Sequence, residues 1–588
     1  MKKDALTRKL TEKERPAECW ADERWLYFKP TTFLPEVKEW GGSWRREIGA
    51  FRLPKLTSVM RKVHNIDPLV PTSDEALLLL GDWDQRAIIK GRRNGRFNHL
   101  YDFQKRAHDA LLTRPYHGEL LALSPGLGKT PTSIVAADSW VKEHGESKRI
   151  LVVAPLSLLK NWEREITGHQ IKDPFQWSSD PRVEICHQME PTPDRSVRWT
   201  ITNYDSILER GRDPHTKRVV VTGWLNEAFD LNWDIVIFDE SVLLKNRKAK
   251  RVRAALALAN CAKRVWLLSG APITRDNSDL WQQMQIIEPE YFSSFWRFAK
   301  EYCVVIESQW SNFEIVGSRK DKDMRHDFPE LMFIRNQEEV FPELPEYIWQ
   351  DVELELHPKQ QKAHDEVIEE WIHELEENRD RRVEVTAVIA MLVRLQQITS
   401  NLYNLQTAGS GDWPDYSAKA DYVEELLDSG QVDWPVLIWT HHRPGAHALY
   451  DRLTRKTKKR DSALYGRRVE LVYGGTKDRD TQIEDYKSGK IDVLILGIQV
   501  GKYGHTLVNT RTVITYDKTW DSDAWFQMLH RVRRNGLTHR PLVINPRCRG
   551  TVDDYVELNL AGKLPDMAKL TGADLAKILR SLGEEFVT

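Results

Sequence analysis

The sequence predicts an α/β protein with two parallel-sheet lobes, a helical insertion between them and a small α+β module in front. From residue 120 onward, short β-rich apolar runs alternate with longer amphipathic stretches, which is the pattern of a parallel sheet covered by helices. The same alternation returns after residue 434, so a second lobe of the same class is expected. The length of 588 residues also exceeds what one hydrophobic core supports.

The expected strands are short apolar runs. In the first lobe they are 120–123, 150–153, 235–238 and 265–268, and in the second they are 436–439, 469–472, 493–496, 513–516 and 542–544. Between the lobes, residues 364–398 repeat apolar side chains at helical spacing without Gly or Pro, and 407–417 have the composition of a linker. We therefore divide the chain into an N-terminal module (1–98), a first lobe (99–350), a helical insertion with linker (351–415), a second lobe (416–547) and a C-terminal segment (548–588).

Composition excludes several classes of protein. Hydrophobic residues (41%) and charged residues (29%) occur in globular proportions, so the chain is not a disordered or fibrous protein. The 86 basic residues nearly cancel the 87 acidic ones, so binding to nucleic acid would need local basic surface. There is no apolar run of membrane-spanning length, and the five cysteines are far apart, without zinc or disulfide spacing. We expect no membrane association and a reducing, cytoplasmic location, in a bacterial or phage-infected cell rather than a eukaryotic nucleus.

A glycine-rich turn follows the first expected strand. In LSPGLGKTPTS, Gly126, Gly128, Lys129 and Thr130 match the end of a phosphate-binding loop, and Leu123 stands where that pattern has its first Gly. Glycines let backbone N–H groups surround phosphate oxygens, a lysine adds a cation, and a threonine hydroxyl binds Mg²⁺. The sequence therefore predicts a site for ATP and Mg²⁺; the alternative is an ordinary Gly-rich turn before a helix.

Two adjacent carboxylates end the apolar strand in WDIVIFDES. Because parallel strands end at one edge of their sheet, we expect Asp239 and Glu240 beside the phosphate loop. Asp239 would hold Mg²⁺, and Glu240 would orient or deprotonate the attacking water. Alone, such a pair is more often a solvated turn; with Lys129 upstream, it indicates phosphoryl transfer.

Two arginines lie near the end of the second lobe. In FQMLHRVRRNG, Arg531 and Arg534 are three residues apart and would share one face of a helix. Their guanidiniums could reach the γ-phosphate from the second lobe, so that hydrolysis would depend on lobe closure. The alternative is a solvated basic helix face.

These motifs, from about residue 101 to about residue 560, resemble the Swi/Snf-type branch of the superfamily II helicase-related ATPases. YDFQKRAHDALL resembles the Gln motif of that family, LVVAPLSLLKNWERE its motif Ia, DESVLLKNRKAKRVRAA its motif II and LLSGAPITRDNSDLW its motif III. VLIWTHH, LVYGGTKDRDTQIEDY and residues 497–536 resemble motifs IV to VI, and TVDDYVELNLAGK resembles a C-terminal brace helix. The resemblance implies two RecA-like lobes with a split ATP site between them.

The resemblance also implies roles for individual residues. Gln104 would read adenine, Gln527 would contact the nucleotide, and residues 269–272 would couple hydrolysis to movement. The residues that would face DNA are Pro155, Ser157, Thr202, Tyr204, Lys245, Asn246, Gly475, Gly501 and Trp520. The chain departs from the family at Val242, at residues 336–337 and at residues 497–499.

The N-terminal module is the best clue to the substrate. Its aromatic and basic residues include Trp40, Trp44, Arg45, Arg46, Phe51 and Arg52, and it resembles the HARP-like modules that precede the motor in annealing helicases. A packing domain without a DNA role is an equal alternative. Downstream, Lys90, Arg92, Arg93 and Arg96 could clamp phosphates or form a solvated hairpin tip.

We therefore expect a DNA-stimulated ATPase, monomeric, that moves along double-stranded DNA, with forked or branched DNA in replication, repair or recombination as one class of substrate. The runner-up is a strand-separating 3′ to 5′ helicase. From another class, the chain could remove proteins from DNA, or be a regulatory subunit that has lost hydrolysis, although the intact site residues argue against such a loss.

Overall fold

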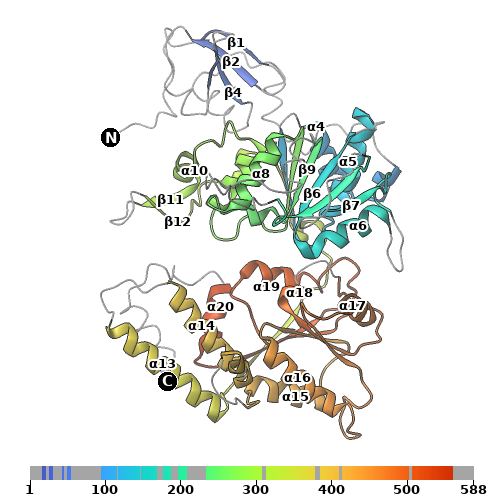
Figure 1. Cartoon of the computed structure of the whole chain (residues 1–588), viewed down its shortest axis with the longest axis vertical. Coiled ribbons are helices and arrows are strands. Elements are labelled where there is room, and N and C mark those ends of the chain that lie inside the picture. Colours follow the sequence, from blue (N-terminus) through green and yellow to red (C-terminus); the bar gives the residue numbers. More distant parts are fainter. Residues whose placement is uncertain are drawn as a thin grey trace, which may run out of the picture. The chain divides into compact units, whose positions relative to one another are not determined.

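A computed structural model gives the structure of the chain. It describes residues 16–21, 25–30, 43–45, 50–54, 95–114, 117–145, 148–168, 176–186, 196–207, 233–306, 313–377, 385–408, 414–501 and 506–560. The chain divides into two compact units, Met1–Val340 and Phe341–Thr588, which Figure 1 colours from blue to red along the sequence. Among the described residues, no helix has both the length and the apolar character needed to cross a membrane.

The N-terminal module contains a four-stranded antiparallel sheet. Its strands are β1 (Pro16–Ala21), β2 (Trp25–Pro30), β3 (Ser43–Arg45) and β4 (Ala50–Pro54), in the order β1-β2-β4-β3. Trp44 of β3 pairs with Phe51 of β4, and Arg52 pairs with Ser43, so part of the predicted aromatic and basic set shares one hairpin. The predicted residues Trp40, Arg46, Lys90, Arg92 and Arg93 lie outside the described residues.

The rest of unit 1 is built on a seven-stranded parallel sheet. The strand order is β13-β5-β10-β9-β6-β8-β7. The strands are β5 (Gly118–Leu123), β6 (Ile150–Ala154), β7 (Val183–Ile185), β8 (Trp199–Asn203), β9 (Ile235–Asp239), β10 (Arg264–Ser269) and β13 (Met332–Arg335). Residues of β5, β6, β8 and β9 are buried throughout, which explains why three of these strands read as continuous apolar runs. The four predicted strands of the first lobe are confirmed.

Helices and one hairpin accompany this sheet in the described part of unit 1. They are η4 (Gly95–His99), α4 (Asp102–Thr113), α5 (Lys129–His144), η5 (Leu156–Leu158), α6 (Leu159–Thr167), η6 (Ser241–Leu244), α8 (Lys250–Asn260), α9 (Ser278–Ile287), α10 (Phe295–Tyr302), the antiparallel strands β11 (Cys303–Ile306) and β12 (Glu314–Ser318), α11 (Met324–Asp327) and α12 (Gln337–Val340). Helix α6 packs against β7 and β8, and α9 packs against β5 and β10.

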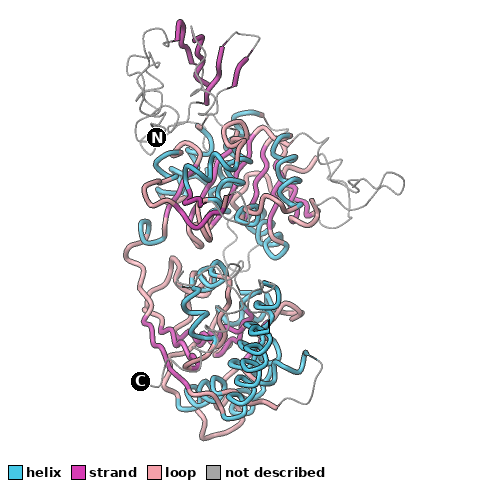
Figure 2. Tube along the Cα trace, turned by 90° about the vertical axis from the view of Figure 1, so that its left-hand side faces the viewer, coloured by secondary structure: helices cyan, strands magenta, loops and turns pink. Residues whose placement is uncertain are grey.

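Unit 2 is built on a six-stranded parallel sheet, in the order β14-β19-β18-β15-β17-β16. Its strands are β14 (Ile348–Leu354), β15 (Val436–Thr440), β16 (Val469–Val472), β17 (Val493–Gly497), β18 (Thr512–Thr515) and β19 (Leu542–Cys548). Its helices are α13 (Pro358–Glu377), α14 (Val385–Ser400), η7 (Leu402–Ala408), α15 (Ala418–Ser429), α16 (Arg443–Lys456), α17 (Arg479–Lys487), α18 (Ile498–Gly501), α19 (Ser522–Leu529) and α20 (Val552–Leu560). Figure 2 distinguishes its helices (cyan) from its strands (magenta).

The boundary between the units differs from the predicted one. Strand β14 pairs along its whole length with β19, so residues 348–350 belong to the second sheet and not to the first lobe. Unit 2 begins at Phe341, whereas the sequence placed the boundary after residue 350. Most residues of β14 are exposed, and a polar edge strand of this kind carries no apolar run to mark it in the sequence.

The predicted helical insertion packs within unit 2. Helices α13 and α14 contact each other, and α14 also contacts α15 and α20. Their apolar side chains form a cluster around Leu395 and Ile398 that includes Val552 of α20. The predicted brace helix corresponds to α20, which is described as far as residue 560. It packs on the insertion helices through Val552.

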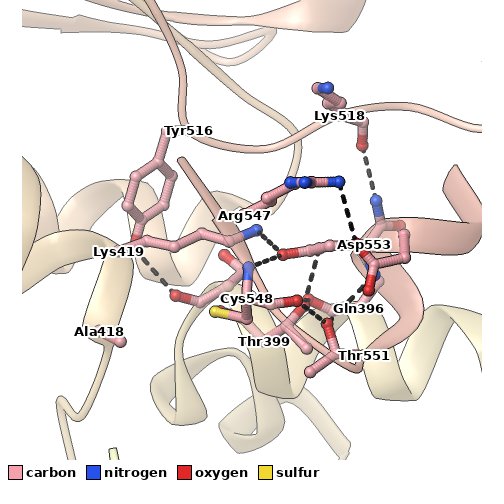
Figure 3. Close-up of polar contacts among 12 residues, drawn as sticks. Gln396, Thr399, Ala418, Lys419, Tyr516, Lys518, Arg547, Cys548, Thr551 and Asp553 are labelled. Carbon is pink, nitrogen blue, oxygen red and sulfur yellow. Dashed lines mark hydrogen bonds and ion pairs between the residues drawn. The ribbon is translucent and has the colours of Figure 1, made fainter. Parts of the chain in front are cut away.

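A buried ion pair joins these elements (Figure 3). The ammonium of Lys419 lies 2.7 Å from a carboxylate oxygen of Asp553, and both side chains are almost fully buried. Asp553 also accepts hydrogen bonds from the Cys548 backbone N–H (2.9 Å) and the Thr399 hydroxyl (3.2 Å). Burial is the largest influence on Lys419 and by itself lowers its pKa, but the charge and hydrogen bond of Asp553, with the charges of Cys548 and Asp517, together raise the pKa above its ordinary value. Asp553 therefore connects α14, α15 and β19 to the start of α20.

We predict that Asp553→Ala lowers the free energy of unfolding by about 3–5 kcal/mol, because Lys419 is then a buried charge without a counter-ion. Adding Lys419→Met should recover part of this loss. Asp428→Ala is the control, because it removes a more exposed ion pair to Lys456 and should cost about 1 kcal/mol or less. Urea unfolding of the full chain measures wild type and the three variants; a double variant no more stable than the single one would contradict the prediction.

Candidate active site

The predicted phosphate-binding loop connects β5 to α5. Gly126 and Gly128 both have positive φ (+90° and +76°), a conformation that favours glycine. Lys129 is the first residue of α5, and its ammonium donates a hydrogen bond to the Leu123 carbonyl (3.0 Å). The loop, its lysine and the positive end of the α5 dipole therefore lie together, as the sequence predicts.

Gln104 of α4 lies against this loop. Its amide N–H donates to the Leu127 carbonyl, and its oxygen accepts from the Tyr101 N–H, both at 2.9 Å. A Cβ added to Gly128 would be only 2.2 Å from the Gln104 amide nitrogen. The backbone angle therefore favours glycine, and a side chain there would displace the Gln104 amide from the Leu127 carbonyl.

The carboxylate pair lies at the same edge of the sheet. Strand β10 separates β5 from β9, and all three are parallel, so the phosphate loop and Asp239 follow strand ends at one edge. Asp239 is buried, and its oxygens accept hydrogen bonds from the Trp162 indole N–H (2.8 Å) and the Glu240 backbone N–H (2.9 Å). Burial, and secondly the Glu240 charge, raise the pKa of Asp239 to about 6, while the Trp162 hydrogen bond and the Lys129 charge oppose this rise. Lys129 and Asp239 thus interact electrostatically.

Glu240 has a strained backbone. It is the single non-glycine residue among those described with a positive φ (+50°), and its Oε2 atom is buried without a hydrogen-bond partner. Residues in this region of backbone space concentrate at functional sites, where the surrounding structure holds them. The free oxygen can accept a hydrogen bond from a bound water or substrate.

The residues present fit Mg²⁺. Thr130, the second residue of α5, and Asp239 offer a hydroxyl and a carboxylate, the hard oxygen ligands that Mg²⁺ prefers. When bound, the metal would neutralise phosphate charge. The positive charge of Lys129 acts on Asp239 and would add to that of the metal at this position.

Two supporting residues could not be identified from the sequence. Trp162 fixes Asp239 from α6, and Gln283 of α9 accepts from the Ser241 hydroxyl (2.8 Å) and donates to the Pro272 carbonyl (2.9 Å). Gln283 therefore links the segment after Glu240 to the predicted coupling segment 269–272. That segment also reaches the phosphate loop, because a Cβ on Gly270 would lie 3.4 Å from the Lys129 ammonium.

The predicted DNA-facing residues of unit 1 divide into two groups. Ser157, Lys245 and Asn246 are exposed, and Pro155 is half-buried at the end of β6. Thr202 and Tyr204 are buried instead, and the Tyr204 hydroxyl donates to the Asp239 carbonyl (2.8 Å). The surface role expected for these two side chains is therefore corrected, because both face the interior.

In unit 2, Gly475 is exposed after β16 and Trp520 is half-buried against the α13–α14 cluster. Gly501 is buried, and a Cβ there would lie 2.1 Å from the Trp439 ring. Close packing on Trp439 therefore explains this glycine, and the expectation that it faces DNA is corrected.

The two arginines do not share a helix face. Helix α19 contains the buried Gln527 but ends at Leu529, and Arg531 and Arg534 follow in a turn in which the Arg531 carbonyl accepts from the Leu507 N–H (2.8 Å). The Arg534 guanidinium donates to the His530 carbonyl (2.7 Å) and the Thr506 hydroxyl (2.8 Å). Burial, and then the charge of Arg531, lower the pKa of Arg534. The turn nevertheless brings the two guanidiniums near each other.

The chain matches known proteins over most of its length. Residues 44–404, more than half of the chain, match the SNF2-related domain, and residues 418–536 match the helicase conserved C-terminal domain. The chain is 25% identical over 463 residues to the DNA annealing helicase and endonuclease ZRANB3 of Bos taurus, covering 78% of this chain and 39% of that protein. It is 26% identical over 449 residues (74% and 40% of the two chains) to the SWI/SNF-related matrix-associated actin-dependent regulator of chromatin subfamily A-like protein 1 of Xenopus laevis.

The chain thus spans about two fifths of the length of these two relatives. Among solved structures, the Sulfolobus solfataricus SWI2/SNF2 ATPase core in complex with dsDNA is similar at a TM-score of 0.34 and 21% identity, over 82% of this chain and 94% of that one.

We predict that Gly128→Ala abolishes ATP binding, because the new methyl group meets Gln104 and strains the loop. Gly145→Ala is the control: Gly145 also has positive φ (+106°), but no atom lies within 4 Å of the place that its Cβ would take, so only stability should fall, by about 1–3 kcal/mol. Binding of a fluorescent ATP analogue distinguishes the two. Wild-type affinity in Gly128→Ala would contradict the packing argument.

The raised pKa of Asp239 predicts a pH-dependent stability in the nucleotide-free protein. Its stabilising contribution is full below the ordinary pKa near 4 and is lost as the pH rises through about 6, because the folded state then loses its extra proton. Asp239→Asn cannot titrate there, so its stability relative to wild type should increase by about 2 kcal/mol between pH 4.5 and 7.5. Urea unfolding at the two pH values measures this difference; a pH-independent difference would contradict burial as the dominant cause.

Proposed function

The chain belongs to the SNF2-related family, and from that premise we propose that it is a DNA-dependent ATPase that moves along double-stranded DNA. The single observation that carries the proposal is the electrostatic unit formed by Lys129, Asp239 and Glu240 at one sheet edge in unit 1. A turn with two positive-φ glycines, a cation and two carboxylates supplies the groups that phosphoryl transfer requires.

Each residue of this unit has a proposed role. Lys129 binds the β and γ phosphates, Thr130 and Asp239 hold Mg²⁺, and Glu240 orients the attacking water with its free buried oxygen. Gln104 contacts adenine while bonded to the loop. Trp162 and the Glu240 N–H keep the Asp239 carboxylate in place, so that its position does not depend on the metal.

We propose that Arg531 and Arg534 complete the site, with Gln527 nearby. Both arginines come from the turn after α19, and burial, followed by the positive charge of Arg531, disfavours the charged form of the half-buried Arg534. An anion such as a γ-phosphate relieves that repulsion, which favours nucleotide binding at this turn. Hydrolysis would then require both units.

DNA is the proposed track, and forked or branched DNA is the proposed substrate class. The exposed Ser157, Lys245, Asn246 and Gly475 offer backbone groups and charge to phosphates. One of the relatives is named a DNA annealing helicase, which supports remodelling of DNA. A strand-separating 3′ to 5′ helicase and a remover of proteins from DNA are the alternatives.

We predict that Lys129→Ala and Glu240→Gln each abolish duplex-stimulated ATP turnover, measured as phosphate release. Lys129→Ala should also weaken nucleotide binding, whereas Glu240→Gln should retain it, because Glu240 acts on water. Arg531→Ala or Arg534→Ala should lower turnover by about 10³- to 10⁵-fold with binding retained. Turnover of the wild-type chain that is indifferent to single-stranded, duplex and forked DNA would reject the proposed function, and unwinding of a tailed duplex would favour the helicase.

A further inference from the structure

Cationic and aromatic side chains alternate across one surface of unit 1. We name this set the aromatic–basic strip; it consists of Arg247, Phe295, Trp296, Lys300 and Phe313. The Arg247 guanidinium carbon lies 3.9 Å from the Phe295 ring centroid and 6.0 Å from that of Trp296. The Trp296 and Phe313 centroids are 5.6 Å apart, and the Lys300 ammonium lies 4.3 Å from the Phe313 centroid. The strip is therefore continuous.

The strip is open to solvent at its centre. Trp296 is 37% exposed, whereas the largest fully buried side chains of the described residues include five other tryptophans. Arg247 and Lys300 are exposed, and neither forms an ion pair with a carboxylate in the described part of the chain. An exposed tryptophan between two such cations is poorly explained by packing and indicates a binding surface.

The strip connects two further features. At one end, Arg247 directly follows Lys245 and Asn246, and Lys248 and Lys250 beside it are also exposed. At the other end is the β11–β12 hairpin, which stands beside α10 in Figure 1 and exposes Val304, Ile306 and Val316. The surface therefore passes from basic to aromatic and then to apolar side chains.

We propose that the aromatic–basic strip binds unpaired nucleotides of a forked or tailed DNA, with a base stacked on Trp296 and phosphates beside Arg247 and Lys300. Exposed aromatics interleaved with cations are the groups that single-stranded nucleic acid requires. A regular duplex keeps its bases stacked inside and offers nothing to the face of Trp296. The inference rests on the proposed function and deepens it, because it names a DNA with a single-stranded arm as the preferred substrate.

The test compares the full chain on a blunt duplex and on the same duplex with a single-stranded arm, by fluorescence anisotropy without nucleotide. Wild type should bind the armed DNA more tightly. Trp296→Ala should weaken this binding about fivefold or more, the loss expected for one base stack, and should leave blunt-duplex affinity unchanged. Trp296→Phe should retain most of the preference, and Lys300→Glu should lose it while leaving the aromatic packing of Trp296 intact.

Trp349→Ala is the matched control, because Trp349 is 49% exposed on β14 and lies outside the strip; it should bind both DNAs as wild type does. Equal affinity of Trp296→Ala and wild type for the armed DNA would overturn the proposal, as would an equal loss on both DNAs. The readout of this test is binding and not ATP turnover. ATP turnover that is indifferent to DNA would reject the proposed motor function alone. A preference for the armed DNA that depends on Trp296 would still support the strip.

Discussion

The burial of one negative charge, on Asp239, is the constraint on which the nucleotide site depends. A carboxylate in this position is unfavourable by itself, and its raised pKa expresses that cost. The surrounding structure offsets it with the Trp162 indole, the Glu240 N–H and the field of Lys129. Each of these groups comes from a different segment, so satisfying the charge also fixes α6, the end of β9 and the phosphate loop relative to one another.

The residue that follows this charge has a strained backbone. Glu240 donates its N–H to the Asp239 carboxylate, has a positive φ and keeps a buried side-chain oxygen without a partner. Gln283 holds the next residue, Ser241, and the Pro272 carbonyl together. One side chain of α9 therefore connects the segment that follows Asp239 to residues 269–272.

Much of this could be predicted from the sequence, because the informative residues are contiguous. Strands such as β5 and β9 are buried on both faces and read as apolar runs, and Gly128, Lys129, Asp239 and Glu240 lie at or just after their ends. Trp162 and Gln283 could not be found this way, since they are 77 and 42 residues from their partners. The sequence predicts helix around Arg531 because no Gly or Pro interrupts the pattern before Gly536, whereas in the structure α19 ends at Leu529 and the Arg531 carbonyl accepts a tertiary bond from Leu507.

Unit 2 also buries a charge, which here is the positive charge of Lys419. Lys419 requires a carboxylate, and Asp553, which supplies it, comes after the last strand, at the start of α20. An unpaired buried charge would lower the stability of the unit. The strands of the second sheet therefore need Asp553 of α20 beside them. The segment that resembles a brace is thus an integral part of the unit. The loop after β18, which carries Trp520, is joined to α14 by the Gln396 bond to the Lys518 carbonyl (2.7 Å).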